Sequence, residues 1–173
     1  YLSVAEALRH AAWAQDASAE IAWIDAEELE KPEGERLLSD LDGIIVPGGF
    51  GLRGTEGMLA AARYARERHL PYFGICLGMQ TAVIEFARDA TGLAGANSGE
   101  FDPASPHKVI DFMPGQSESV DKGGTLRLGA CPCEIVPGTT LARCYGQDEV
   151  WERHRHRYEL NNAYRGRLTA AGL

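Results

Sequence analysis

Cys76 is the residue best placed for chemistry in this sequence, because glycines stand two residues before it and two residues after it. The apolar run at residues 71–75 predicts a short strand, and residues 79–87 predict a helix. Strand, Gly-x-Cys-x-Gly and helix in this order are the layout of a nucleophile elbow, with cysteine in place of serine. The strained turn needs small neighbours, and the start of a helix favours a thiolate. A buried core cysteine is the alternative, but two glycines at this spacing favour the nucleophile.

A glycine-rich segment at residues 47–54 is the second candidate for a functional element. It follows the apolar run at residues 43–46, which is typical of a parallel strand covered on both faces. Four glycines within residues 48–54 allow backbone N–H groups to approach a ligand closely. The segment lacks the lysine of a phosphate-binding loop and the spacing of a dinucleotide-binding loop, so a flexible connection is the alternative.

The elements that must position these two segments follow from hydrophobic periodicity. Helices are expected at residues 3–15, where Ser3 and Glu6 suggest a capping box, and at residues 55–69. Strands are expected at residues 21–24, 43–46, 71–75, 109–113, 124–128 and 133–136. A surface connection with one helical turn is expected at residues 27–39, and a loop at residues 91–102. Residues 151–159 predict one extended strand. It would place Arg153, Arg155 and Arg157 on one face and His154, His156 and Tyr158 on the other.

This order predicts a single α/β domain over residues 1–173, in three layers with a largely parallel central sheet. Such a domain normally opens on a strand, whereas this sequence opens on a helix. We therefore expect that a first strand is absent from the chain.

Composition excludes several functional classes. The chain has 173 residues, of which 45% are hydrophobic and 24% charged, as in an ordinary globular domain. The net charge of −8 argues against a general nucleic-acid or anionic-membrane surface. We expect no signal peptide, and no apolar run in these 173 residues is long enough for a membrane span. The four cysteines lack the spacing of a zinc site, so we predict no metal, reduced thiols and a cytoplasmic protein.

The motif at residues 74–80 resembles the nucleophile motif of the class I (triad) glutamine amidotransferases, which have a flavodoxin-like fold. Four further segments resemble the glutaminase domain of the CTP synthases, and the resemblance covers the whole chain. These segments lie at residues 47–54, 96–102, 123–129 and 152–162. The last one, in which arginines alternate with histidines before two asparagines, is the most specific of them.

The resemblance implies a mechanism in which Cys76 attacks the side-chain amide of L-glutamine, releases ammonia and leaves a thioester for water to hydrolyse. The backbone N–H groups of Gly49 and Leu77 would form the oxyanion hole. Glu100 would bind the α-ammonium group of glutamine, and Arg157 its α-carboxylate. Backbone groups would complete the glutamine pocket, from Leu77, Gly78, Met79, Gln80 and Tyr158.

The resemblance also implies partners that lie outside this domain. Ammonia would pass to a synthetase domain of the same polypeptide, which uses ATP and Mg²⁺ to convert UTP to CTP and forms a homotetramer. The glutaminase domain itself would need no cofactor. GTP would act as an activator, and the segment with Phe50 and Arg53 is the candidate lid for that effect.

The sequence departs from the family at the general base, since the triad histidine and glutamate belong to a His-Pro-Glu motif. None of the five histidines precedes Pro-Glu: His10, His69, His107, His154 and His156. We expect His154 and His156 to pack or form hydrogen bonds rather than act as the base.

The chain is thus expected to be a fragment without its last portion and inactive by itself. The alternatives are a glutaminase domain of a different synthase and a non-catalytic, amidotransferase-like binding protein. Smaller departures are Gly99, where the family has threonine, and a short stretch at residues 116–122.

Overall fold

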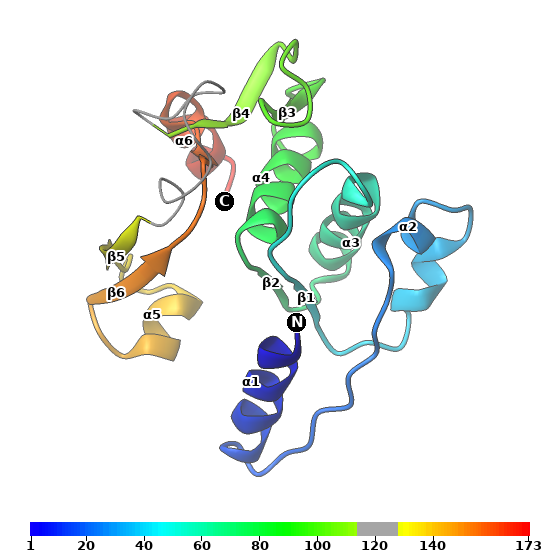
Figure 1. Cartoon of the computed structure of the whole chain (residues 1–173), viewed down its shortest axis with the longest axis vertical. Helices are drawn as coiled ribbons and strands as arrows, with labels where there is room; N and C mark the ends of the chain where they lie inside the picture. The colour runs from blue at the N-terminus through cyan, green and yellow to red at the C-terminus, as the bar shows by residue number, and fades with distance from the viewer. Residues whose placement is uncertain (114–127) are drawn as a thin grey trace. The chain divides into compact units, whose positions relative to one another are not determined.

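The computed structural model describes residues 1–113 and 128–173 (Figure 1). It divides into two compact units, which are described separately. The first consists of Tyr1–Asp111 and Leu160–Leu173, and the second of Phe112–Glu159. Three sequence features lie wholly or mostly outside the described residues: the strand expected at 124–128, the motif at 123–129 and the short stretch at 116–122.

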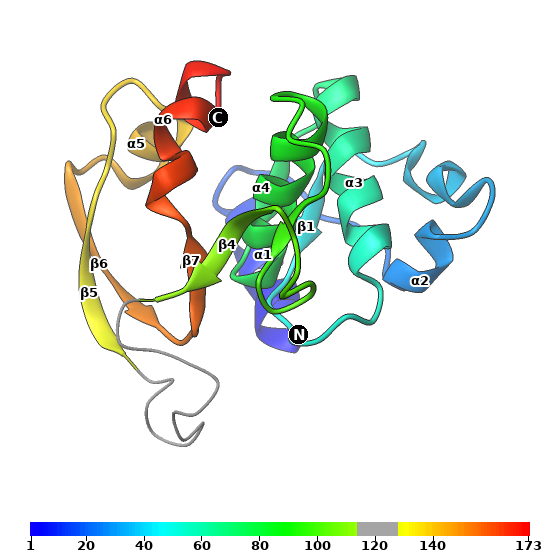
Figure 2. The same cartoon turned by 90° about the horizontal axis from the view of Figure 1, so that it is seen from above.

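Two parallel strands and two helices form the centre of the first unit. β1 (Ile44–Val46) pairs in parallel with β2 (Tyr72–Gly74), and Val46 lies opposite Gly74. The helices α3 (Thr55–Arg68) and α4 (Leu77–Asp89) lie side by side (Figures 1 and 2). The predictions of strands near residues 43–46 and 71–75 and of a helix at 55–69 are confirmed. One core cluster joins β1 and α3 to the chain before β1: Leu29, Leu38, Ile44, Val46, Ala61 and Ala65.

The rest of the first unit consists of short elements. Three precede β1, namely α1 (Leu2–Trp13), α2 (Ala26–Leu29) and the 3₁₀ helix η1 (Gly34–Leu38). β3 (Ala96–Ser98) pairs in parallel with β4 (His107–Phe112). β7 (Tyr158–Leu160) spans the boundary between the two units in sequence. α6 (Asn162–Ala170) closes the unit. The predicted α/β class with parallel strands and helices is confirmed.

The second unit is built on an antiparallel pair of strands. β5 (Gly129–Glu134) runs beside β6 (Glu149–His154), and α5 (Thr140–Tyr145) lies between them in sequence. The Thr139 hydroxyl caps α5 by accepting a hydrogen bond from the N–H of Ala142 at 3.1 Å. The helix ends at Gly146, whose φ of 63° is a conformation that favours glycine. None of the helices in residues 1–113 and 128–173 is long and apolar enough to cross a membrane.

Sequence patterns failed at several places, one of which is the loop expected at residues 91–102, where β3 forms. Residues 21–24 form no strand, since Ile24 packs on the core cluster as irregular chain while Trp23 is 65% exposed. The predicted capping box of Ser3 and Glu6 does not form. α1 begins at Leu2, one residue before Ser3, and the Glu6 carboxylate forms an ion pair with Arg9 within the helix. The connection at residues 27–39 includes the helical turn that was expected, but it does not lie wholly at the surface, since leucines of α2 and η1 are buried. The strand at 151–159 is broken, because pairing with β5 ends at His154 and β7 begins only at Tyr158.

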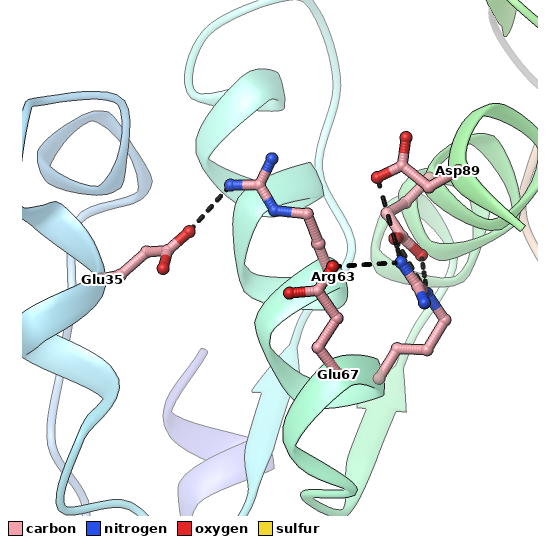
Figure 3. A network of polar contacts seen from close by, with 6 residues as sticks. Glu35, Arg63, Glu67 and Asp89 are labelled. Carbon is pink, nitrogen blue, oxygen red and sulfur yellow. Dashed lines mark hydrogen bonds and ion pairs between the residues drawn. The ribbon is translucent and has the colours of Figure 1, made fainter.

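A buried ion pair holds α3 and α4 together. Arg66 donates from Nε and Nη2 to the carboxylate of Glu85 at 2.6–3.1 Å, and the Glu85 side chain is only 5% exposed. Arg66 also lies 3.7 Å from Glu67 and 3.9 Å from Asp89. Figure 3 shows Glu67 and Asp89 in this network of polar contacts, together with Arg63 and Glu35. Because α4 begins directly after Cys76, this pair fixes the nucleophile helix against its neighbour.

Replacing Arg66 with methionine is expected to lower the free energy of unfolding by about 2 kcal/mol, because the buried carboxylate of Glu85 loses its bidentate partner. The matched variant Glu85→Gln is expected to cost less, since the Arg66 side chain is 33% exposed and can turn to water. Urea unfolding of the two variants at neutral pH measures the difference. Equal losses of unfolding free energy in the two variants would contradict this prediction, because they would show that the deeper burial of Glu85 than of Arg66 has no energetic consequence.

Candidate active site

Cys76 occupies a strained turn between β2 and α4. Its φ of 53° and ψ of −105° lie outside the regions that residues with a side chain ordinarily adopt. Neighbouring hydrogen bonds hold the turn: the N–H of Ile75 donates to the Val46 carbonyl at 2.9 Å, and the N–H of Gln80 donates to the Cys76 carbonyl at 3.0 Å. The strand–turn–helix layout expected for a nucleophile elbow is therefore present.

The two flanking glycines are required by close backbone contacts. A Cβ atom on Gly74 would lie 2.5 Å from the backbone of Gly78 and Met79. A Cβ atom on Gly78 would lie 2.0 Å from the carbonyl oxygen of Val46 in β1. The first turn of α4 thus packs directly on the strand backbone, which is the reason for glycines at these two positions.

Two hydroxyl groups that the sequence gave no reason to single out secure this first turn. The Tyr72 and Thr81 hydroxyls both donate to the carbonyl oxygen of Gly78, at 2.8 and 3.0 Å. Burial raises the pKa of Tyr72 to about 12, although the Thr81 hydroxyl acts in the opposite direction. The phenol therefore stays protonated and remains a donor at neutral pH. Only their positions in the sequence could have drawn attention to these hydroxyls. Tyr72 lies in the strand before the elbow, and Thr81 lies one helical turn after Gly78.

The glycine-rich segment lies against the elbow. A Cβ atom on Gly48 would be 3.4 Å from the Cβ of Cys76, and one on Gly49 would be 3.0 Å from the Leu77 side chain. The structure therefore brings Gly49, Cys76 and Leu77 together. Farther along the segment, Phe50 is exposed and the guanidinium of Arg53 bonds to the Glu27 carboxylate at 2.8 Å.

The residues after Cys76 differ in exposure. Leu77, Gly78 and Gln80 are buried in the first turn of α4, whereas Met79 is exposed. Backbone, rather than these buried side chains, would therefore have to supply contacts to a ligand beside Leu77 and Gly78.

Glu100 lies near enough to Cys76 to influence its ionisation. Burial is the largest cause that raises the pKa of the Cys76 thiol, and the negative charge of Glu100 adds to it. The backbone N–H of Leu77 acts in the opposite direction by stabilising the thiolate. The position of Glu100 is fixed through Ser98, which is fully buried and accepts a hydrogen bond from the Glu100 N–H at 3.1 Å. The expected stabilisation of the thiolate by the helix start is thus outweighed in the free chain.

Replacing Glu100 with glutamine is expected to lower the pKa of Cys76, because one of the two causes that raise it is removed. Since the thiolate is the reactive form, alkylation of Cys76 by iodoacetamide at pH 8 is expected to become faster. The pKa stays above its ordinary value because burial remains. The measurement is the alkylation rate against pH, read at the Cys76 peptide by mass spectrometry. Glu20→Gln, which removes an exposed carboxylate, is the control, and an unmoved inflection in Glu100→Gln would contradict the prediction.

Arg157 and Tyr158 belong to the second unit. Tyr158 stacks on Phe112, with ring centroids 4.4 Å apart, and the Arg157 guanidinium lies 5.4 Å from the centre of the Phe112 ring. The Arg157 carbonyl accepts a hydrogen bond from the N–H of Met113 at 2.9 Å. The predicted carboxylate-binding arginine is therefore held by its side chain and by its backbone.

His154 and His156 form a short hydrogen-bonded chain beside them. Nδ1 of His154 lies 3.0 Å from Nε2 of His156, and Nδ1 of His156 lies 3.1 Å from the Tyr158 carbonyl. Burial and the neighbouring His154 lower the pKa of His156. These contacts agree with the expectation that the two rings form hydrogen bonds. In the two described ranges, no cluster of three or more histidine, cysteine, aspartate or glutamate residues could hold a metal ion.

Comparison with known proteins decides the family. The sequence profile of the class I glutamine amidotransferases matches residues 1–172. The chain belongs to this family. It is 60% identical over all its 173 residues to CTP synthase of Carboxydothermus hydrogenoformans and 59% identical to CTP synthase of Thermus thermophilus. These residues make up 32% of each relative, so the amidotransferase chain spans about a third of the length of these relatives.

A solved structure extends the likeness to three dimensions. The Trypanosoma brucei CTPS glutaminase domain with bound acivicin matches with a TM-score of 0.91 at 43% identity. The match covers 99% of this amidotransferase chain and 66% of that chain. Together with the family profile, it confirms the family and the fold that the sequence predicted.

Proposed function

We propose that this chain is the glutaminase part of a CTP synthase, which hydrolyses L-glutamine to supply ammonia for the ATP-dependent amination of UTP to CTP. The observation that carries the proposal is the strained Cys76 at the start of α4, with Gly48 and Gly49 packed against the turn. The likeness of the whole chain to the CTP synthases supports the choice of synthase. We further propose that both units belong to one amidotransferase domain, since the family profile extends through both.

In the proposed reaction, the Cys76 thiolate attacks the carbon of the glutamine side-chain amide. A C–S bond forms, and the C–N bond breaks as the nitrogen leaves with a proton as ammonia. Water then attacks the thioester and releases glutamate and the thiol. Proton transfer falls to the triad histidine and glutamate of the family's His-Pro-Glu motif, which does not occur in these 173 residues.

The proposed pocket assigns one task to each residue. Backbone N–H groups of Gly49 and Leu77 stabilise the oxyanion, a task supported by the packing of Gly49 on Leu77 and by the action of the Leu77 N–H on the thiol. Glu100 binds the α-ammonium group, and that contact also offsets the charge that disfavours the thiolate. Arg157 binds the α-carboxylate. Backbone groups at residues 77–80 and at Tyr158 complete the pocket.

The remaining partners are proposed from kinship with the CTP synthases. A synthetase domain of the same polypeptide would use ATP and Mg²⁺ and form a homotetramer, in a cytoplasmic enzyme that handles free nucleotides. GTP would activate the glutaminase through the segment with Phe50 and Arg53. For this, Arg53 would have to exchange its contacts with Glu27 and Asp25, at 2.8 and 3.8 Å, for the phosphates of GTP.

Protection of Cys76 from alkylation tests glutamine binding. L-glutamine is expected to slow the reaction of iodoacetamide with Cys76 and to leave the exposed Cys144 unaffected. Equal rates at Cys76 with and without glutamine would contradict the proposal. The gene tests the rest: its coding sequence is expected to contain a synthetase domain and to continue past Leu173 into a His-Pro-Glu motif. A stop codon at Leu173 would favour a non-catalytic binding protein.

A further inference from the structure

Phe112 has no task in the proposed reaction, although it contacts residues that do. Phe112 is the last residue of β4, and it contacts two consecutive residues of the proposed glutamine pocket. Its ring stacks on Tyr158 with an interplanar angle of 29°, and the Arg157 guanidinium carbon lies 5.4 Å from its centre. All three residues belong to the second unit.

We propose that Phe112 is a positioning residue that orients Arg157 for the α-carboxylate of glutamine. This inference rests on the proposed function, because that function assigns the carboxylate to Arg157. A guanidinium within about 6 Å of a ring centre is attracted to the π face of the ring. The attraction restricts a long and flexible side chain before the substrate arrives, so less conformational entropy is lost on binding.

The choice of an aromatic partner has a chemical reason. A carboxylate occupies the same N–H fork that a substrate carboxylate needs. A ring attracts the positive charge through its quadrupole and does not compete as a hydrogen-bond acceptor. Phe112 can therefore hold Arg157 without blocking its task.

The backbone supports the same arrangement. Met113, which follows Phe112, donates its N–H to the Arg157 carbonyl at 2.9 Å. On the other side, His156 Nδ1 lies 3.1 Å from the Tyr158 carbonyl. Residues 156–158 are thus fixed at the backbone while Phe112 contacts the side chains of Arg157 and Tyr158. The contact of Phe112 with the guanidinium carbon adds a restraint on the direction of the Arg157 side chain.

The test compares two ligands in three proteins: the wild-type chain, Phe112→Leu and Phe112→Tyr. Leucine keeps much of the apolar volume but removes the π face, whereas tyrosine keeps both. The readout is the ligand concentration that halves the rate of Cys76 alkylation by iodoacetamide. The ligands are L-glutamine and L-glutaminamide, in which a neutral amide replaces the α-carboxylate. Thermal unfolding of each variant checks that it is folded.

Phe112→Leu is expected to raise the half-protecting concentration of L-glutamine by roughly threefold to tenfold. It is expected to leave that of L-glutaminamide unchanged, and Phe112→Tyr is expected to restore the wild-type value for glutamine. Equal losses for both ligands, or no loss for either, would overturn the role of Phe112 while wild-type protection by glutamine still supports the proposed function. Failure of glutamine to protect the wild-type chain would contradict the proposed function, and this inference with it.

Discussion

Ammonia release from L-glutamine is expected to fall by about 10⁴-fold or more when Cys76 is replaced with alanine, because the sulfur atom proposed to form the thioester is removed. The structure supports this size of effect, since the turn that presents Cys76 is strained and other groups are arranged around it. The N–H of Leu77 acts on the thiol, and Gly48 lies against its Cβ. A strained turn that presents a single thiol is expected of a nucleophile, whereas a core cysteine does not need one.

The full-length gene product is the sample for this measurement, with Cys144→Ala as the matched control. Cys144 is a free cysteine that is exposed in α5, so its loss is expected to leave ammonia release unchanged. The wild-type protein and both variants are assayed at equal concentration, and thermal unfolding confirms that each is folded. Retention of ammonia release by Cys76→Ala would assign the reaction to another group and remove the basis of the proposed mechanism.

The sequence was most informative where chemistry and backbone geometry depend on the same residues. Gly74, Cys76 and Gly78 predicted the elbow because only a tight turn needs glycine at that spacing, and the structure has that turn. The helix that starts there follows from the same motif. The family was also within reach of the sequence, since its motifs are local strings of residues, and the profile match confirms it.

Contacts between distant segments could not be read from the sequence in this way. The stacking of Phe112 on Tyr158 joins residues 46 positions apart, and neither residue belongs to a pattern that names its partner. The charge of Glu100 acts on a thiol that lies far away in the sequence. The raised pKa of Cys76 could therefore be inferred only from the tertiary structure. The prediction of one strand over residues 151–159 was wrong for a similar reason. Alternation of side chains was present, but pairing with β5 ends at His154, and only tertiary structure determines where a partner strand stops.

Gly78→Ala is expected to lower the free energy of unfolding by about 3 kcal/mol or more, the largest stability effect that we predict for a single methyl group here. The added Cβ would lie 2.0 Å from the carbonyl oxygen of Val46 and 2.7 Å from its carbonyl carbon. These are backbone atoms of a paired strand, so no side-chain rotation relieves the clash. Either α4 moves away from β1 or β1 leaves its pairing with β2. Both movements displace Cys76 and the hydroxyls of Tyr72 and Thr81 that bind the Gly78 carbonyl.

The control for this change is Gly166→Ala, which adds the same methyl group inside α6. A Cβ atom there would meet nothing within 4 Å, so alanine is expected to stabilise the helix by up to about 1 kcal/mol through its lower conformational entropy. Urea unfolding of the two variants therefore separates a steric effect from a propensity effect, since propensity favours alanine at both positions. Because movement of α4 also displaces the nucleophile, Gly78→Ala is expected to change the alkylation rate of Cys76, and Gly166→Ala is expected to preserve it. Wild-type stability and wild-type alkylation in Gly78→Ala would show that α4 does not need its close contact with β1 to present Cys76.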